Sequence, residues 1–378
     1  MNKSISKLLS GMALLLLAQH AIAAGPAVIA KSDRSLWPDP INSAAGFDRA
    51  SRAEILVFAD ALAQVSDEDD ATLRTTLHIK NIDRTSIQRV RDRLVSKLLD
   101  NMKAASASCA AGEPFCARVD TPQALIEAGR TLPGQLPAKY RAWYDNAAAF
   151  HHIYAEELIR LAALFGKVSS EIDTYGPGER NGFEMPDRHF LLTFDDGPTR
   201  AGGNTDTLLP VLRQNGIHGM FFVLGDELQK RIAATGKDNV QKLYAGQCVG
   251  LHGWVHKSHQ HWSEWQTSVL DTQKLVTDVL PASYRPYFRP PYGQRRSDSG
   301  PFFASHHLTV ELWNIDSQDW NPKVSETDAA QRVLTLMLLW RSGVILFHDV
   351  HTKAPTAVPW LISQTRQANI TWDDCRDY

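Results

Sequence analysis

The sequence predicts an α/β fold preceded by an all-helical amino-terminal region. Two observations support this prediction. Residues from about 50 to 175 place apolar side chains at three- and four-residue spacings with charges between them, as amphipathic helices do. From His189 onward, short apolar runs alternate with helical patterns, which is typical of parallel strands joined by crossover helices.

Length and composition limit the class of protein further. At roughly 150 residues per domain, 378 residues suggest one large domain or two ordinary ones. The 43% of hydrophobic and 22% of charged residues exclude a disordered or collagen-like chain. A net charge of -2 offers no basic excess for a nucleic-acid partner. The ten Trp fit either a large aromatic core or surfaces that stack on sugar rings.

Residues 1–23 are expected to be a secretory signal peptide. Lys3 and Lys7 precede an apolar run over 8–18, and small residues then lead to a cleavage pattern at Ala23. The run is shorter than the roughly 20 residues that a membrane-spanning helix needs. An uncleaved anchor is therefore the less favoured alternative. We expect a periplasmic or secreted protein with no stable membrane anchor after signal removal.

Four cysteines in such an oxidising compartment predict disulfide bonds. Cys109, Cys116, Cys248 and Cys375 allow three connectivities. Cys109 and Cys116 close a short loop and are the preferred pair, which leaves Cys248 with Cys375. None of the spacings is C-x-x-C, so a thiolate metal site is not favoured.

Residues 24–185 are expected to form a helical accessory domain. No carboxylate pair, His cluster or Gly-rich loop stands in it at a spacing that demands chemistry, so its expected role is packing, orientation or partner contact. Thr121 and Pro122 predict the cap and first turn of a helix through Ala128. The other expected helices cover 53–64, 84–105 and 138–165, and the Gly- and Pro-containing stretch 179–186 is expected to be a linker.

Residues 186–378 are expected to form the domain that carries the chemistry. The expected strands are 189–194, 219–223, 248–251, 287–289, 310–314 and 344–347. The expected helices are 205–214, bent at Pro210, then 239–245, 264–280 behind Ser263, and 327–341 behind Ser325.

Ionisable residues stand at or just beyond the carboxyl ends of five of these strands. In α/β barrels and open α/β sheets, catalytic groups gather at that face, so we expect these residues to form one site. They are Asp195 with Asp196, His252 with His256, Arg289, Asp316 with Asp319, and His348 with Asp349.

Two His at i and i+4 together with a carboxylate make a three-ligand set for a divalent cation. His252 and His256 fit the pair, with Asp195 or Asp196 as third ligand. The other carboxylate would take the proton from a water that the cation activates, and His348 could give a proton to the leaving group. Two further histidines nearby, His259 and His261, are expected to be ordinary surface residues.

Five short motifs, in order, resemble those of the polysaccharide deacetylases, the NodB homology domain of carbohydrate esterase family four. The similarity covers about 188–367, roughly half of the chain. The motifs are TFDDGP at 193–198, HGWVH at 252–256, RPPYG at 289–293, DSQDW at 316–320 and LFHD at 346–349.

The resemblance implies a distorted (β/α) barrel and metal-dependent removal of N- or O-acetyl groups from sugars. Carried over by position, Asp195 is the general base, and Asp196, His252 and His256 are the metal ligands. The expected metal is Zn²⁺, with Co²⁺ or Ni²⁺ as alternatives. The second motif departs from the family, which usually has Ser or Thr where Gly253 stands. The departure removes no ligand, but it takes away a hydroxyl that helps to fix the loop.

The same resemblance makes His348 the general acid, tuned by Asp319 rather than by Asp316. It also implies that Arg289 orients the general base and that the backbone N–H of Tyr292 helps to bind the oxyanion. Amide hydrolysis needs these three things: an activated water, a stabilised oxyanion and a proton for the amine.

The sequence thus predicts a hydrolase of linear amides that removes N-acetyl groups from an extracytoplasmic, N-acetylglucosamine-containing glycan. Chitooligosaccharides, peptidoglycan and exopolysaccharide all fit. An O-acetyl esterase acting on xylan would use the same residues and stays open as an alternative. A non-catalytic carbohydrate-binding barrel is less favoured, because the expected acid, base and ligand residues are all present.

Overall fold

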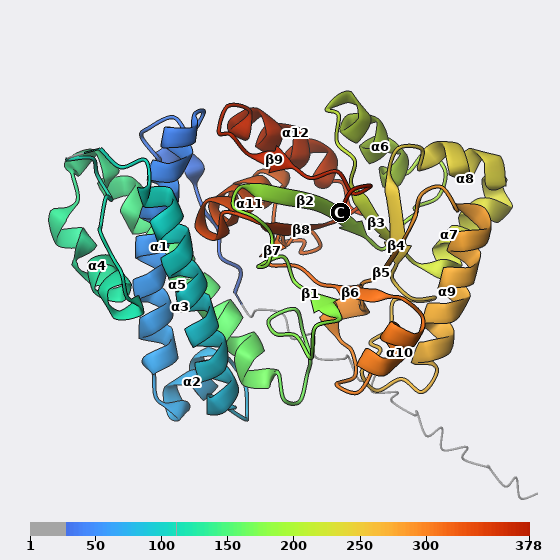
Figure 1. Cartoon of the computed structure of the whole chain (residues 1–378), viewed down its shortest axis with the longest axis horizontal. Helices are drawn as coiled ribbons and strands as arrows, with labels where there is room; N and C mark the ends of the chain where they lie inside the picture. The colour runs from blue at the N-terminus through green and yellow to red at the C-terminus, as the bar shows by residue number, and fades with distance from the viewer. Residues whose placement is uncertain (1–27, 111) are drawn as a thin grey trace, which may run out of the picture.

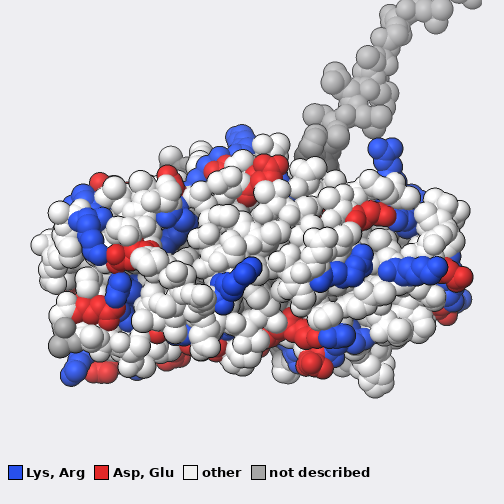
Figure 2. Space-filling model, turned by 90° about the horizontal axis from the view of Figure 1, so that it is seen from above, with Lys and Arg blue, Asp and Glu red and all other residues white. Residues whose placement is uncertain are grey.

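The computed structural model describes residues 28–378 except 111. The predicted signal peptide lies outside the described residues. Among the residues described, no helix is long and apolar enough to span a membrane. On the face that Figure 2 shows, Lys and Arg alternate with Asp and Glu, and broad uncharged areas separate them.

The amino-terminal helices pack along one flank of the sheet (Figure 1). The expected helices are present, and α2 is an addition to them. Ser43 starts the first helix ahead of the predicted range, because its side chain caps the N–H of Gly46. The helices are α1 (Ala44–Asp67), α2 (Asp70–Thr76), α3 (Arg84–Ser106), α4 (Pro122–Gln135) and α5 (Arg141–Leu164), with 3₁₀ turns at Arg34–Leu36 and Ala138–Tyr140.

Nine described strands form one sheet, and every pairing in it is parallel. The order is β1-β6-β5-β4-β3-β2-β8-β7, and β9 also pairs with β2. The strands are β1 (Glu179–Arg180), β2 (His189–Asp195), β3 (Met220–Val223), β4 (Cys248–Leu251), β5 (Tyr284–Phe288), β6 (Thr309–Glu311), β7 (Ile315–Asp316), β8 (Gly343–His348) and β9 (Thr371–Trp372).

The sheet curls into the distorted (β/α) barrel that the motifs predicted. The expected strand 310–314 is wrong in its extent, because the chain leaves β6 after Glu311 and enters β7, at the far end of the strand order, at Ile315. The three residues between them cross from one end of the strand order to the other, and no pairing among the described strands joins β1 to β7, which leaves an open seam in the barrel. The stretch expected to be a linker also contributes the short strand β1 to the sheet.

Helices follow most of the strands and lie around the barrel (Figure 1), although β6 leads directly to β7 and two helices separate β3 from β4. Ser325 and Asp328 form a capping box at the start of α11, so the start predicted behind Ser325 is confirmed. The start predicted for α9 is wrong by one residue, because this helix begins behind Glu264 and not behind Ser263. The helices are α6 (Asn204–Gln214), α7 (Gly225–Thr235), α8 (Lys237–Leu243), α9 (Trp265–Val279), α10 (Gly300–Ser305), α11 (Glu326–Trp340) and α12 (Ala354–Thr365).

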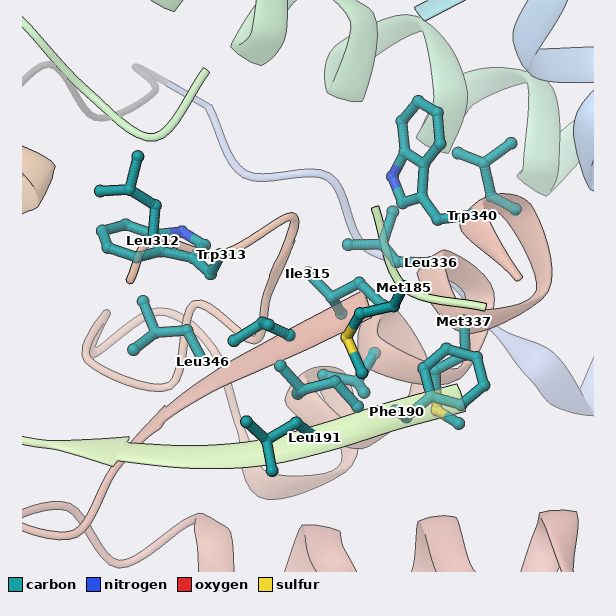
Figure 3. Packing of buried hydrophobic residues seen from close by; sticks show 14 of the residues in the cluster. Met185, Phe190, Leu191, Leu312, Trp313, Ile315, Leu336, Met337, Trp340 and Leu346 are labelled. Atoms are coloured by element: carbon teal, nitrogen blue, oxygen red, sulfur yellow. The ribbon is translucent and has the colours of Figure 1, made fainter. Parts of the chain in front are cut away.

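The core continues from the barrel into the helical region through α11. Figure 3 shows Met337 and Trp340 of this helix packed among Met185, Phe190 and Ile315. On its other side α11 contacts α1 and α3. The indole N–H of Trp340 donates to the hydroxyl of Tyr154 on α5 at 2.9 Å. These contacts place α5 beside the open seam of the barrel.

Both predicted disulfide bonds are present. Cys109 bonds Cys116 within the helical region, and Cys248 at the start of β4 bonds Cys375 near the chain end.

Candidate active site

Two neighbouring carboxylates at the end of β2 point in different directions. Asp195 is the last residue of the strand and lies in register with His348 at the end of β8. Asp196 follows with φ of 79°, a left-handed conformation that non-glycine residues seldom adopt. The sharp change of direction separates the environments of the two carboxyl groups.

Arg289 holds the carboxylate of Asp195 in place. Its buried guanidinium donates to Asp195 Oδ1 at 2.9 Å and to the hydroxyl of Thr193 at 2.6 Å. It also donates to the backbone carbonyls of Glu311 at 3.1 Å and Leu312 at 3.0 Å. A side chain with four such bonds cannot turn away, so the position of the Asp195 carboxylate is fixed from one side.

Asp196 faces the two histidines. Its Oδ1 lies 3.2 Å from His252 Nε2 and 3.5 Å from His256 Nε2, and one ligand atom from each residue falls within 4.8 Å of the others. This oxygen is buried and has no hydrogen-bond partner among the described residues. Buried polar atoms are normally satisfied, so the position fits a bound cation.

The histidines are prepared to act as ligands. His252 Nδ1 donates to the carbonyl of Arg289 at 2.7 Å, which leaves Nε2 as the ring nitrogen that faces Asp196. Burial lowers the pKa of His256 to about 4, so its ring is neutral at neutral pH, as a ligand must be. The His256 side chain is 32% exposed, and it provides the open side of the site.

The loop between the two histidines is anchored from α9. Gly253 has φ of +85°, and a Cβ there would lie 2.7 Å from the ring of His259. The hydroxyl of Ser268 on α9 instead accepts the backbone N–H of Trp254 at 2.7 Å. The surface expectation for His259 is wrong: the ring is buried beneath the loop, whereas His261 is exposed as expected.

His348 and Asp319 form a buried pair. His348 Nδ1 donates to Asp319 Oδ1 at 2.7 Å, and its backbone N–H donates to the other carboxylate oxygen at 2.9 Å. Burial alone would lower the pKa of His348, but the charge of Asp319 and this hydrogen bond raise it to about 10. Asp316 lies apart from this pair and accepts the N–H of Gln318 at 2.7 Å.

Two motif residues take supporting positions. Tyr292 has φ of 61° and places its ring 4.4 Å from that of His256, edge to face. Asp349 is buried and accepts the hydroxyl of Thr205 at 2.7 Å. A Cβ on Gly197 would lie 2.0 Å from Asp349, so the motif after β2 packs directly on this carboxyl group.

The site opens into a cavity of about 260 Å³ that the sequence did not indicate. Asp195, Asp196, both histidines and His348 line it together with Tyr292 and Trp320. The helical region supplies much of the remaining wall. Its apolar residues have the spacing of side chains that pack in a core, so nothing in the sequence indicated that they line a cavity. The contributing residues are Tyr154, Glu157, Leu158, Leu161, Glu171, Ile172 and Phe183.

The barrel thus gathers two carboxylates, three histidines and a possible cation site at its strand ends, a set of groups that suits hydrolysis. Comparison with known proteins agrees, since residues 183–310 match the family model described as polysaccharide deacetylase. Residues 183–310 thus resemble the polysaccharide deacetylase family, and the chain is an enzyme of that class.

Three relatives illustrate the similarity. A peptidoglycan-N-acetylglucosamine deacetylase of Bacillus cereus is 29% identical over 224 residues, which cover 56% of this chain and 77% of the relative. A bifunctional xylanase/xylan deacetylase of Cellvibrio japonicus is 31% identical, covering 46% of this chain and 25% of the relative. Chitin deacetylase 1 of Saccharomyces cerevisiae is 30% identical, covering 42% of this chain and 50% of the relative. The chain thus spans half or less of the last two relatives.

Proposed function

We propose that the protein removes N-acetyl groups from an N-acetylglucosamine-containing glycan outside the cytoplasm. The observation that carries the proposal is the arrangement of two carboxylate–partner pairs around one cavity. Asp195, held by Arg289, lies beside the candidate ligands, and His348, held by Asp319, lines the same cavity. A base and an acid so placed suit the two proton transfers of amide hydrolysis.

The cation, when bound by Asp196, His252 and His256, supplies Lewis acidity that polarises the amide carbonyl and lowers the pKa of a water. Asp195 accepts the proton of the attacking water. Arg289 holds this carboxylate in place. The backbone N–H of Tyr292 donates to the developing oxyanion.

His348 then protonates the leaving amine. Because Asp319 holds Nδ1, the proton is delivered from Nε2, the nitrogen that remains for the cavity. An amine leaves poorly without a proton, so this acid matters more for an amide than for an ester.

Zn²⁺ is the cation that we propose for the site. One carboxylate and two imidazoles with room for further ligands suit Zn²⁺, and they also suit Co²⁺ and Ni²⁺. The neutral His256 and the orphaned oxygen of Asp196 support a resident cation of this kind.

The names of the relatives favour N-acetyl substrates, since two of the three are deacetylases of peptidoglycan N-acetylglucosamine or of chitin. A second candidate, O-deacetylation of xylan, is favoured by the relative from Cellvibrio japonicus. An extracytoplasmic site of action is supported by the signal-like residues 1–23 and by two disulfide bonds, which persist in oxidising compartments.

Acetate release from four substrates tests the proposal: chitooligosaccharides, peptidoglycan, poly-N-acetylglucosamine and acetylxylan. We expect release from at least one of the three N-acetylated glycans, with a higher kcat/KM than on acetylxylan. Release from acetylxylan alone would favour the esterase. Binding of glycans by the Zn²⁺-loaded protein without any release would favour the non-catalytic barrel.

A further inference from the structure

Two carboxyl groups in the cavity wall form no ion pair with any described residue. Glu171 follows α5 in the helical region, and Asp316 ends β7 of the barrel. Both residues line the cavity and are half-buried, so a ligand can reach their side chains. Because Glu171 precedes residues 183–310, the stretch that matches the family model does not supply this part of the wall.

The basic side chains whose charge acts on these two carboxyl groups are already paired with other acids. Arg332 pairs with Glu157 at 2.6 Å, and Arg295 donates to Glu179 at 2.8 Å. The two carboxyl groups are therefore left without a contact that offsets their charge. A cationic ligand in the cavity would supply one.

A buried acceptor lies beside Asp316. Gln318 is 4% exposed and lines the cavity, and its Nε2 donates to Asp316 Oδ2 at 3.1 Å. Its Oε1 has no hydrogen-bond partner within the part of the chain that the structure describes. Buried polar atoms are normally satisfied, so this oxygen indicates that a donor is missing at this position.

The same wall contains one unpartnered donor. Trp313 is 7% exposed and lines the cavity, and its indole N–H meets no acceptor among the described residues. This part of the wall thus offers the carboxyl groups of Glu171 and Asp316 and the amide oxygen of Gln318 as acceptors, and the indole as a donor. An amino sugar matches this set, because its ammonium group carries three donors and its hydroxyl oxygens accept.

A sugar ammonium fits the two carboxyl groups better than a second metal ion does. Neither belongs to a group of described side chains whose ligand atoms converge closely enough to hold a metal. Burial raises the pKa of Glu171 to about 8 and that of Asp316 to about 6, and the charge of Asp316 adds to the rise at Glu171. A neighbouring ammonium opposes these shifts, because an opposite charge favours the ionised carboxylate.

We propose that Glu171, Asp316 and Gln318 bind the ammonium group of a glucosamine unit that neighbours the sugar being deacetylated. This step rests on the proposed function, whose product carries such an amine. Removal of one acetyl group therefore creates the group that the cavity recognises when the neighbouring sugar is processed. The enzyme accordingly prefers partly deacetylated glycans to fully acetylated ones.

Disaccharides that differ in one substituent test this preference on the wild type. Chitobiose carries two acetamides, each of its two monoacetylated isomers carries one acetamide and one amine, and the matching analogues carry a hydroxyl in place of that amine. Initial rates of acetate release are compared at about pH 6.5, where an amine with an ordinary pKa of roughly 8 is protonated. We expect kcat/KM on one of the isomers to exceed that on chitobiose at least about tenfold, since hydrogen bonds to charged groups contribute about this much. The hydroxyl analogues should show no such rise.

Fully deacetylated chitobiose contains no acetyl group, so its binding to the Zn²⁺-loaded wild type is measured without turnover. By calorimetry we expect it to bind at least about tenfold more tightly than cellobiose, which carries hydroxyls at the same positions. Glu171→Gln should weaken this binding about tenfold and abolish the rate preference for the monoacetylated isomer. An amine that only ligated the cation would bind equally to Glu171→Gln and to the wild type.

Glu156→Gln is the matched control, because Glu156 is a half-buried residue of α5 that does not line the cavity. It should leave both the binding and the rate preference unchanged. Asp316→Asn is the second variant of the site and should act in the same direction as Glu171→Gln. Thermal unfolding shows which variants are folded, and the comparison of disaccharides on the wild type decides without any of them.

Equal kcat/KM on chitobiose and on both monoacetylated isomers overturns the inference. An equal rise on the hydroxyl analogues also overturns it, because this part of the wall would then be a hydroxyl site. So do equal effects of Glu171→Gln and Glu156→Gln. If the wild type releases acetate from chitobiose while any of these results is found, the proposed function stands and only the ammonium inference fails. If no glycan is deacetylated, the proposed function fails, and the calorimetric comparison still decides whether the ammonium site exists.

Discussion

Two adjacent carboxylates can serve different roles only if their surroundings differ. Asp195 accepts a hydrogen bond from the guanidinium of Arg289 and lines the cavity. Asp196, turned by its positive φ, meets His252 and His256 instead. The backbone conformation at Asp196 therefore separates the proposed base from the proposed ligand, although the two residues are neighbours in sequence.

Because the proposed base and the proposed metal ligands are separate, substituting one or the other should have different effects on activity and on metal content. Asp195→Asn should keep one divalent cation per chain yet lose activity about 100-fold or more, because an amide cannot accept the proton of the attacking water. His252→Ala should lose the cation itself. Metal analysis of both purified variants beside wild-type protein distinguishes the outcomes. A full complement of metal in His252→Ala would refute the ligand assignment.

The buried pair of His348 and Asp319 leads to a prediction about leaving groups. His348→Ala should reduce hydrolysis of N-acetylglucosamine oligomers by about 100-fold or more, since the amine needs a proton to leave. Hydrolysis of an activated aryl acetate should fall much less, because a phenolate leaves without one. The ratio of the two rates in the variant and in the wild type is the measurement. Equal losses on both substrates would argue against His348 as the acid.

At the scale of elements, the ends of most long strands were predictable, whereas the end of β6 and several shorter elements were not. The strands β2 and β8 are buried in the centre of the sheet, and their long apolar runs predict them from composition alone. The strands β1, β7 and β9 have two residues each, too few for any periodicity. Helix α12 contains Pro355 and Pro359, which look like breakers in sequence. Whether such short or proline-containing segments form a strand or a helix depends on their contacts with distant parts of the chain.

The candidate site shows the same division. Most of its motif residues could be predicted because they stand beside recognisable strands, whereas Asp319 follows the two-residue strand β7 and was predicted from its motif alone. Ser268 could not, because nothing in the pattern of α9 shows that its hydroxyl reaches the backbone of Trp254. The cavity wall from α5 could not either, since Leu158 and Leu161 have the spacing of core residues. Residues that act through distant contacts leave no local signal.

The contact between α9 and the histidine loop is testable. Ser268→Ala removes the acceptor for the N–H of Trp254 and should loosen the loop that carries both ligands. We expect cation affinity to fall about tenfold, the lower end of what supporting residues of metal sites contribute. Competition with a chelator measures the affinity. Thr267→Ala, an exposed neighbour on the same helix, should leave it unchanged; an equal fall in both variants would contradict the role of Ser268.

At the scale of the whole molecule, the helical region and the barrel share one hydrophobic core. Trp340 and Arg332 of α11 bond Tyr154 and Glu157 of α5, and α11 is buried between the two parts. The division of the chain into a helical domain, 24–185, and a catalytic domain, 186–378, stays a prediction. The shared core explains how a region without catalytic motifs can still shape the cavity: it completes the wall where the barrel is open.

The buried carboxyl group of Glu311 links global stability to pH. Burial, together with the nearby charge of Glu184, raises its pKa from an ordinary 4.5 to about 8, although Arg289 and Arg180 oppose the rise. The folded state therefore prefers the protonated acid. This contribution to the free energy of unfolding is fully present below about pH 4.5 and is lost as pH rises toward 8.

Glu311→Gln keeps an uncharged side chain of the same shape at every pH. Relative to the wild type, the variant should therefore gain stability between pH 5 and pH 8, by an amount of the order of a few kcal/mol, since each pKa unit corresponds to about 1.4 kcal/mol. Urea unfolding at the two pH values measures the difference. The exposed Glu264→Gln is the matched control and should track the wild type at both. A stability difference between Glu311→Gln and the wild type that stays constant from pH 5 to pH 8 would show that Glu311 is ionised in the folded protein throughout this range.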